Sequence, residues 1–394
     1  MVTRSAGLLL ACAAGHDLGR FARETIDWPD FLELAERHGL RPLAYRALER
    51  AGLPSPPEVT RALWTASVER GRCNRALSRE LSRVAAALEA GGIACLAFKG
   101  PVLSLLAHGD VALREFGDLD ILVRRRNLHA ARGVLADLGY RSEYAIPGHA
   151  ERALVDAHKH YDIVLRGAAG NLVELHWRTD PDFPVEREDD AWWAACPRIE
   201  LEGMALRSFA PSELMLVLLL HGAKHHWSNL QWLADVAALA RGEPIDWAWI
   251  VARAGELHCR RRLALGALLM RDLLGVPVPR EACGDDPRIA SLAARLSREA
   301  FEPESPPGAA KLLARNFLLY DRMRERVRNA IEAVFAPTFA DWTRWKLPAA
   351  LAFLYFPLRL ARLGGKYSLA ALRSPRSRIA ATLRTPPPPP HSRG

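Results

Sequence analysis

Two aspartates separated by one apolar residue are the side chains whose spacing most directly suggests chemistry. They lie in the run Gly117-Asp118-Leu119-Asp120-Ile121-Leu122-Val123. At the two-residue period of a β-strand, both carboxylates point to one face and Leu119 and Ile121 to the other. Adjacent carboxylates repel each other unless a cation lies between them, and Mg²⁺ prefers oxygen ligands. The pattern favours a metal site, although a solvated turn with two incidental aspartates has the same spacing.

Basic residues and glycines before this pair could hold phosphate groups. Lys99 and Gly100 follow an apolar run at 93–98, which predicts a buried strand, and open a short helical stretch at 101–107. A helix N-terminus with a glycine allows phosphate to approach closely, and Lys99 could add a point charge. Arg114 lies four residues before Asp118, and Gly117 directly precedes it. We therefore expect Lys99, Gly100, Arg114 and Gly117 to contact a triphosphate.

A third carboxylate comes from a later strand. The run Val173-Glu174-Leu175-His176-Trp177 alternates polar and apolar residues, so Glu174 and His176 share a face and Trp177 faces the core. Three carboxylates, Asp118, Asp120 and Glu174, would suit a two-metal phosphoryl transfer as catalytic and metal-binding residues, with His176 lining the same cleft. Ligand bonds of about 2.1 Å to one Mg²⁺ would place the oxygens of Glu174 within about 6 Å of those of Asp120.

These motifs resemble a known family. They are Phe98-Lys99-Gly100-Pro101, Arg114 to Val123, Leu138-Gly139-Tyr140 and Glu174-Leu175-His176-Trp177-Arg178. The pattern KG…R…GDxDhhV…LGY…hEhHWR, with h an apolar residue, is similar to that of bacterial uncharacterised nucleotidyltransferases of the DNA polymerase β superfamily. The resemblance implies a small mixed sheet flanked by helices. It also implies transfer of a nucleoside monophosphate from an NTP, which we expect to be ATP, with Mg²⁺ (or Mn²⁺) as cofactor and release of pyrophosphate.

The resemblance leaves the acceptor, a small molecule or a protein, unidentified. One departure concerns the glycine motif, because Lys99-Gly100 stands where the wider superfamily has Gly-Ser or Gly-Gly. The alternative function is therefore a catalytically weak nucleotide-binding regulatory module with the same fold.

A group of polar residues in the later helical region could extend the site. His221 and His225 are four residues apart on one predicted helix, a spacing compatible with a metal ligand pair. His221, Lys224 and Asp235 could instead contact the nucleotide or the acceptor, and Lys224 is counted among the candidate binding residues. The third interpretation, and the favoured one for the histidines, is helix packing at a domain boundary.

The periodicity of apolar residues predicts an α+β fold in four parts. Residues 1–92 have helical spacing and end at Gly91-Gly92, and residues 93–180 alternate strands and helices as the nucleotidyltransferase core. Residues 181–340 are expected to form a helical C-terminal domain. Residues 341–394 comprise an apolar and basic segment followed by a proline-rich tail, Pro386 to Pro390, that should be disordered.

The composition is that of an ordinary globular protein with a basic balance. The 394 residues are 49% hydrophobic and 25% charged, with a net charge of +9. This charge favours phosphate-bearing partners, but the excess is spread along the chain and no known nucleic-acid module is present, which argues against nucleic acid. Six cysteines without a C-x-x-C pair indicate reduced thiols in a cytoplasmic protein. The cationic, aromatic segment 347–366 leaves open a peripheral contact with the inner face of the membrane, although packing against the helices is the favoured interpretation.

Overall fold

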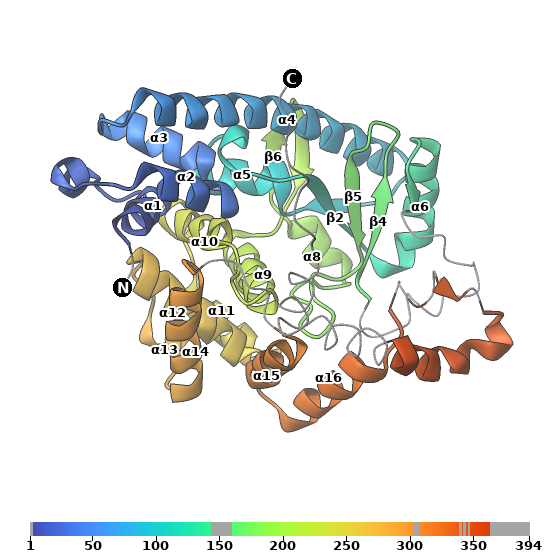
Figure 1. The fold of residues 1–394 in the computed structure, drawn as a ribbon. Helices are drawn as coiled ribbons and strands as arrows, with labels where there is room; N and C mark the ends of the chain where they lie inside the picture. The colour runs from blue at the N-terminus through green and yellow to red at the C-terminus, as the bar shows by residue number, and fades with distance from the viewer. Residues whose placement is uncertain are drawn as a thin grey trace, which may run out of the picture. The chain divides into compact units, whose positions relative to one another are not determined.

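The computed structural model describes residues 3–142, 160–302, 308–338, 341, 344, 345 and 347–362. In this part of the chain, helices accompany a mixed five-stranded sheet (Figure 1), so the expected α+β class is confirmed. The polymerase β-type core and the four-part division remain predictions. The chain divides into two compact units, Met1–Glu143 with Leu154–Val327 and Tyr144–Ala153 with Arg328–Gly394. Every residue of the candidate site belongs to the first unit.

The N-terminal helices begin and end at residues that the sequence marks. The carboxylate of Asp27 accepts a hydrogen bond from the Asp30 backbone N–H and so caps α2, as expected. The 34-residue helix α4 has Pro57 in its first turn and ends before Gly91 and Gly92, the latter with a φ of +70°. The helices are α1 (Arg4–Ala14), α2 (Trp28–Arg37), α3 (Arg41–Ala51) and α4 (Pro57–Ala90).

The sheet has the strand order β1-β2-β5-β4-β3. Strands β2 and β5 are parallel, and the other neighbouring pairs are antiparallel. Strands β4 and β5 form a hairpin, with Gly170 at a φ of +85° in its turn. The strands are β1 (Cys95–Ala97), β2 (Asp118–Val123), β3 (Arg141–Ser142), β4 (Asp162–Arg166) and β5 (Leu172–His176).

The two faces of the sheet have different surroundings. One face packs in an apolar cluster with α4 and α6 (Leu128–Asp137), and its strand residues include Leu119, Ile121, Val173, Leu175 and Trp177. The expectation that Trp177 faces the core is thus confirmed. The opposite face is apolar only toward one end, where Leu96, Phe98 and Leu122 join the cluster of the C-terminal helices. The polar side chains of β2 and β5 project from this second face.

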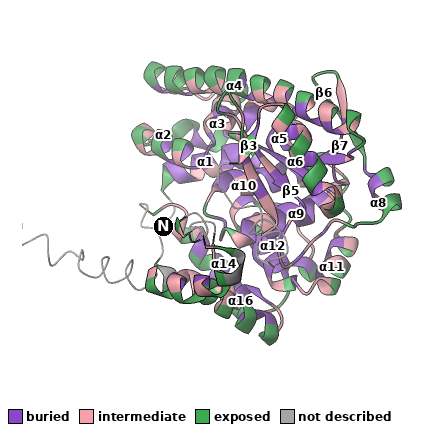
Figure 2. Ribbon diagram, turned by 90° about the vertical axis from the view of Figure 1, so that its right-hand side faces the viewer, coloured by how far each residue is buried: buried purple, intermediate pink, exposed green. Residues whose placement is uncertain are grey.

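Helices dominate the first unit after the sheet, and their central members are largely buried (Figure 2). They are α8 (Asp190–Ala195), α9 (Pro211–Lys224), α10 (Leu230–Gly242), α11 (Trp247–Glu256), α12 (Arg260–Leu274), α13 (Arg280–Cys283), α14 (Pro287–Glu299) and α15 (Ala309–Leu319), with α16 (Met323–Phe335) crossing into the second unit. A hairpin that the sequence analysis missed interrupts them, formed by β6 (Arg198–Leu201) and β7 (Met204–Arg207). Its turn residues Glu202 and Gly203 both have positive φ, the conformation that two-residue hairpin turns need.

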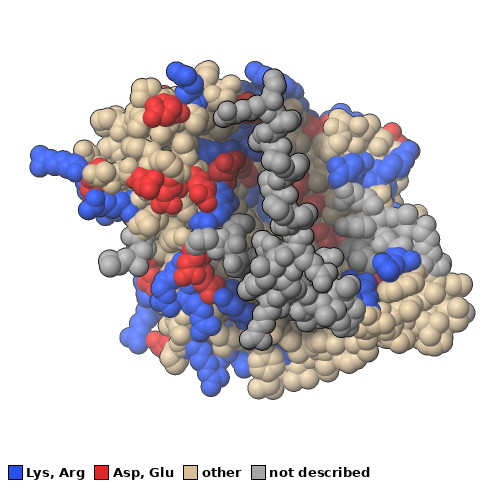
Figure 3. Space-filling view, in the orientation of Figure 1, with Lys and Arg blue, Asp and Glu red and all other residues tan. Residues whose placement is uncertain are grey.

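The segment 347–366, for which packing against the helices was favoured over a membrane contact, is described over residues 347–362. It includes a 3₁₀ helix, Ala349–Leu354, and exposes Phe353 and Phe356. No helix in the described ranges is both long and apolar enough to cross a membrane. Residues 363–394, including the proline-rich tail, lie outside the described part. On the visible face in Figure 3, basic and acidic side chains are interspersed, in keeping with a diffuse charge excess.

Candidate active site

The parallel pairing of β2 and β5 places the acidic residues of the two strands side by side. The register pairs Asp120 with Glu174 and Leu122 with His176. Because side chains alternate along each strand, Asp118, Asp120, Glu174 and His176 project from the same face. The sequence established the alternation in each strand, and the register adds that the two strands are neighbours.

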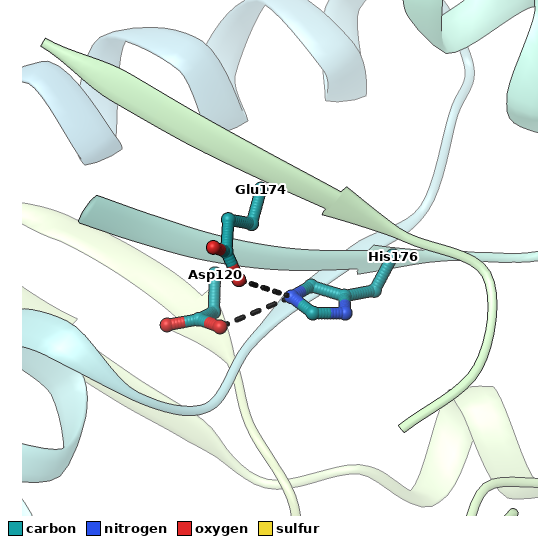
Figure 4. A group of neighbouring side chains, drawn as sticks. All are labelled: Asp120, Glu174 and His176. Atoms are coloured by element: carbon teal, nitrogen blue, oxygen red, sulfur yellow. Dashed lines mark hydrogen bonds and ion pairs between the residues drawn. The ribbon is translucent and has the colours of Figure 1, made fainter. Parts of the chain in front are cut away.

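Asp120, Glu174 and His176 form a group that could hold a metal ion (Figure 4). One ligand atom from each lies within 4.8 Å of the others, which confirms the expected closeness of Glu174 to Asp120. Nε2 of His176 lies 3.0 Å from Oδ1 of Asp120 and 3.5 Å from Oε2 of Glu174. Asp120 and His176 are buried, whereas Glu174 is half-buried. Asp118 is not a member of this tight group.

Two cations balance the carboxylates of the group. Nζ of Lys99 lies 2.7 Å from Oδ1 of Asp120, so this oxygen contacts both Lys99 and His176. Burial alone would lower the pKa of His176, but its hydrogen bonds to Asp120 and Glu174 raise that pKa to about 9. Burial likewise opposes ionisation of Asp120, yet the charges and hydrogen bonds of Lys99 and His176 hold its pKa well below the usual range. The group is therefore an ionic network between β2, β5 and Lys99.

Asp118 has a different electrostatic environment from Asp120. Burial and the negative charges of Asp120 and Glu174 raise the pKa of Asp118 to about 6. The charges of Lys99 and Arg114 offset this repulsion only in part. Among the described residues, no ion pair joins Asp118 to a cation, and it lies beside two other carboxylates, a position that a divalent ion would stabilise.

The helix after Lys99 approaches the strand of the aspartates closely. Helix α5 (Gly100–His108) begins at Gly100, whose φ is +52°. A Cβ atom at Gly100 would lie 3.2 Å from the carbonyl oxygen of Asp118. Glycine is therefore required by both the backbone conformation and the space. Gly117, by contrast, is exposed and would have open space around a Cβ.

Arg114 is held by the C-terminal helices. Its Nε donates to Oδ2 of Asp235 at 2.8 Å, and Nε2 of His108 lies 2.9 Å from the other oxygen of the same carboxylate. Asn74 of α4 donates to the carbonyl of Arg114 at 2.8 Å. The guanidinium is thus buried at an ion pair, close enough to Asp118 to lower its pKa. Asp235 supports Arg114, a role that the sequence analysis did not assign to it.

Strand β4 contributes residues that the sequence analysis missed. Asp162 pairs with His176 across the sheet and lies on the same face, and burial and the charge of Glu174 raise its pKa. The Tyr161 ring stacks on the His176 ring at 5.8 Å, and its hydroxyl contacts Nζ of Lys224. Three consecutive apolar residues follow Asp162, so no polar and apolar alternation singles it out. No local signal marks Tyr161.

His221 and His225 lie together on the last turn of α9. Their ring centroids are 4.7 Å apart, and both rings pack against Trp232 of α10. Neither histidine belongs to the metal-binding group among the described residues. Their pKa values are lowered, first by burial and then by cations that include Lys99 and Lys224. Lys224 on the same turn contacts Tyr161, whose ring stacks on His176, so the last turn of α9 lies beside the carboxylate group.

The residues of the candidate site lie within a span that matches a described family. The profile of the family called uncharacterised nucleotidyltransferase matches residues 24–275, a span that contains every candidate site residue. The chain belongs to the uncharacterised nucleotidyltransferase family. Membership in this nucleotidyltransferase family supports a transferase that uses a nucleoside triphosphate. No curated protein and no solved structure matches the chain.

The donor set of this nucleotidyltransferase fits a divalent cation on its carboxylates. A histidine that binds a metal generally donates its other ring N–H to a partner. Nδ1 of His176 is buried without a hydrogen-bond partner in the described part of the chain. His176 therefore fits better as the hydrogen-bond donor that orients Asp120 and Glu174 than as a ligand, and the oxygen donors that remain suit Mg²⁺ or Mn²⁺.

Proposed function

We propose that the protein is a metal-dependent nucleotidyltransferase of the DNA polymerase β type. It transfers a nucleoside monophosphate from an NTP, ATP in the first instance, to an acceptor and releases pyrophosphate. The observation that carries this proposal is the parallel register of β2 and β5, which sets Asp120 opposite Glu174 on the face that also bears Asp118. Family membership supports the reaction class.

Asp118, Asp120 and Glu174 hold the divalent ions in this proposal. Asp118 and Asp120 bind both ions, and Glu174 binds the one on the acceptor side. When bound, Mg²⁺ or Mn²⁺ supplies charge neutralisation of the phosphates and of the attacking oxygen. The raised pKa of Asp118, caused first by burial and then by the charges of Asp120 and Glu174, supports this assignment, because a bound cation would offset both effects.

The residues around α5 hold the triphosphate. Gly100 brings the helix N-terminus close to β2, and the free N–H groups there suit phosphate oxygens. When metal occupies the carboxylates, the ammonium of Lys99 would leave Asp120 and contact a phosphate oxygen. Arg114, fixed by Asp235, contributes positive potential from its buried position. Gly117 leaves open space beside Asp118.

The reaction exchanges one phosphoester bond for another. An acceptor oxygen attacks the α-phosphorus, and the bond from this phosphorus to the oxygen bridging the β-phosphate breaks. Pyrophosphate leaves with the bonding electrons, and the proton of the acceptor hydroxyl passes to Glu174, which is the most exposed carboxylate of the metal-binding group. Lys224, held beside His176 through Tyr161, is placed to contact the nucleotide or the acceptor.

The test is a transfer assay with each of the four NTPs labelled at the α-phosphate, Mg²⁺ or Mn²⁺, and pools of small-molecule and protein acceptors. We expect metal-dependent labelling of an acceptor and stoichiometric pyrophosphate release. Asp120→Asn should abolish both, whereas Glu200→Gln, which removes a carboxylate from the exposed face of β6, should not. Calorimetry showing equal NTP affinity with and without EDTA would refute the proposal, and metal-dependent NTP binding without turnover would favour the regulatory alternative.

A further inference from the structure

An aromatic cluster beside the carboxylates has no part in the proposed chemistry. It consists of His221 and His225 on α9 and Trp232 on α10, with ring centroids 4.7–5.4 Å apart. His225 is exposed, and the other two side chains are half-buried. A half-exposed group of three flat rings is a surface on which another flat ring can stack.

A strained turn brings the three rings together. His226 and Trp227, the residues that link α9 to α10, have φ values of +54° and +50°, which non-glycine residues rarely adopt. The Trp227 indole is inserted so tightly that a Cβ at Gly222 would lie 2.6 Å from it and a Cβ at Gly266 2.8 Å. Strain of this kind persists only where packing enforces it, and it is concentrated at functional sites. Here it reverses the chain so that Trp232 reaches the rings of α9.

Helix α10 is also anchored to the loop that carries Arg114. Gln231 exchanges two hydrogen bonds of 2.9 Å with the backbone of Glu115, and Asp235 pairs with Arg114. Trp232 lies between these two anchors in the sequence. These contacts tie the part of α10 that carries Trp232 to the residues just before β2, the strand of Asp118 and Asp120.

The charges around the cluster indicate which ligand it suits. Lys224, which directly precedes His225, contacts the hydroxyl of Tyr161, and the Tyr161 ring stacks on His176, so the cluster lies on the side of the carboxylate group. Desolvation by the neighbouring residues and the charges of Lys99 and Lys224 lower the pKa values of both imidazoles, so both rings are neutral near pH 7. Neutral rings offer a phosphate no charge, but they can stack on an uncharged heterocycle.

We infer that His221, His225 and Trp232 form the stacking platform for the base of the nucleoside triphosphate. The inference rests on the proposed function and adds the position of the base. Stacking accepts every base, because each has a π-face, so the platform should bind all four NTPs and favour the larger purines. Selectivity beyond ring size would have to come from other residues.

Calorimetry with the full chain in Mn²⁺ tests the inference by comparing ATP with inorganic tripolyphosphate, which has no base. Stacking on one aromatic side chain corresponds to roughly a tenfold change in affinity. Trp232→Leu and His225→Ala should each weaken ATP binding about tenfold and change tripolyphosphate binding less than twofold. Trp232→Phe should restore most of the loss, and Trp64→Leu, at an exposed tryptophan of α4, is the matched control.

The outcomes separate the platform from the metal site. Unchanged ATP affinity in Trp232→Leu and His225→Ala would overturn the inference, as would a parallel loss of ATP and tripolyphosphate. Wild-type protein that binds tripolyphosphate as tightly as ATP would also overturn it while leaving the metal site intact. If metal supports binding of neither ligand, the proposed function and the platform fail together.

Discussion

The ammonium of Lys99 lies 2.7 Å from Oδ1 of Asp120, the same oxygen that Nε2 of His176 approaches at 3.0 Å. In the metal-free protein these two groups compensate a charge that a divalent ion would otherwise neutralise. Metal binding therefore competes with the protein's own cations.

The Lys99→Met variant should bind Mn²⁺ more tightly than the wild type when no nucleotide is present. Removing one competing charge a few ångströms from the ion should increase Mn²⁺ affinity about tenfold. Two unit charges at this separation interact by roughly 1–4 kcal/mol near a protein surface. The same variant should bind NTP more weakly. Free Mn²⁺ measured by electron paramagnetic resonance checks the first effect. Lys311→Met, at a lysine paired with Glu299, is the control, and unchanged Mn²⁺ affinity in Lys99→Met would contradict the competition.

The two aspartates of β2 should respond oppositely to loss of charge in the metal-free protein. Asp118→Asn removes a repelled carboxylate and should raise the free energy of unfolding by about 1 kcal/mol. Asp120→Asn leaves Lys99 and His176 buried without their anion and should lower it by about 3 kcal/mol. Urea unfolding in EDTA measures both changes. Shifts of the same sign would mean that Asp120 is not the centre of the ion network.

The Glu174→Gln variant should lose turnover while retaining nucleotide affinity. The proposed role of Glu174 concerns the acceptor and its proton, and general-base contributions are typically a hundredfold or more in rate. We expect kcat to fall about a hundredfold and the Kd for NTP with metal to change less than threefold. Rapid-mixing transfer assays and calorimetry give the two quantities. A loss confined to affinity would assign Glu174 to the triphosphate instead.

A methyl group at Gly100 should damage the site more than the same change at the other end of α5. Gly100 and Gly109 both have positive φ, at +52° and +71°, so alanine costs about 1–2 kcal/mol of backbone strain at either. Only at Gly100 does the added atom meet the carbonyl of Asp118, at 3.2 Å. Both variants should lose similar thermal stability, but only Gly100→Ala should lose metal-dependent NTP binding. Equal NTP binding by the two variants would show that the close approach of α5 to β2 has no role in the site.

His38 should make the protein less stable at acid pH. The Leu230 backbone N–H donates to its Nδ1, so Nε2 carries the hydrogen that bonds to the Ala300 carbonyl and the ring is neutral. Burial, and to a lesser extent the charge of Arg37, lowers the pKa of His38 to about 4. The unfolded chain then takes up the proton first, so stability is complete above about pH 6.5 and declines toward pH 4.

The difference between wild type and His38→Asn isolates this effect from that of other histidines. The lowering of the His38 pKa from 6.5 to about 4 corresponds to a loss of about 3 kcal/mol in the free energy of unfolding between pH 6.5 and pH 4. Chemical unfolding at half-unit pH steps gives the two curves. The wild-type curve should fall more steeply over this interval, and parallel curves would show that His38 is not a buried neutral ring.

Features that depend on one strand at a time were predictable from the sequence. The alternation around Asp118 and Asp120, the shared face of Glu174 and His176, and the inward Trp177 all follow from a period of two. The predicted separation of Glu174 and Asp120 was correct because β2 and β5, each with its own alternation of polar and apolar residues, pair directly in the sheet.

Features that depend on distant pairing were not predictable. Arg114 and Asp235 are 121 residues apart in sequence and form a buried ion pair that no local pattern encodes. The contact of Tyr161 with Lys224 and the stacking of Tyr161 on His176 likewise require α9 to be placed against β4. The β6–β7 hairpin was missed because its strands are short and its turn, Glu202-Gly203, is a weaker hairpin signal than Asn-Gly.

Because side chains alternate along β5, the register of this one strand determines both the site and the core. Glu174 and His176 serve the site, while Val173, Leu175 and Trp177 serve the core on the other face. A slip or insertion of one residue would exchange the two sets, burying charge and exposing Trp177. During divergence, a point substitution changes only one face of the strand. A single-residue insertion or deletion within it disrupts the site and the core together, so it is selected against for both reasons. The strand's length is a more constrained character in this lineage than most of its side chains.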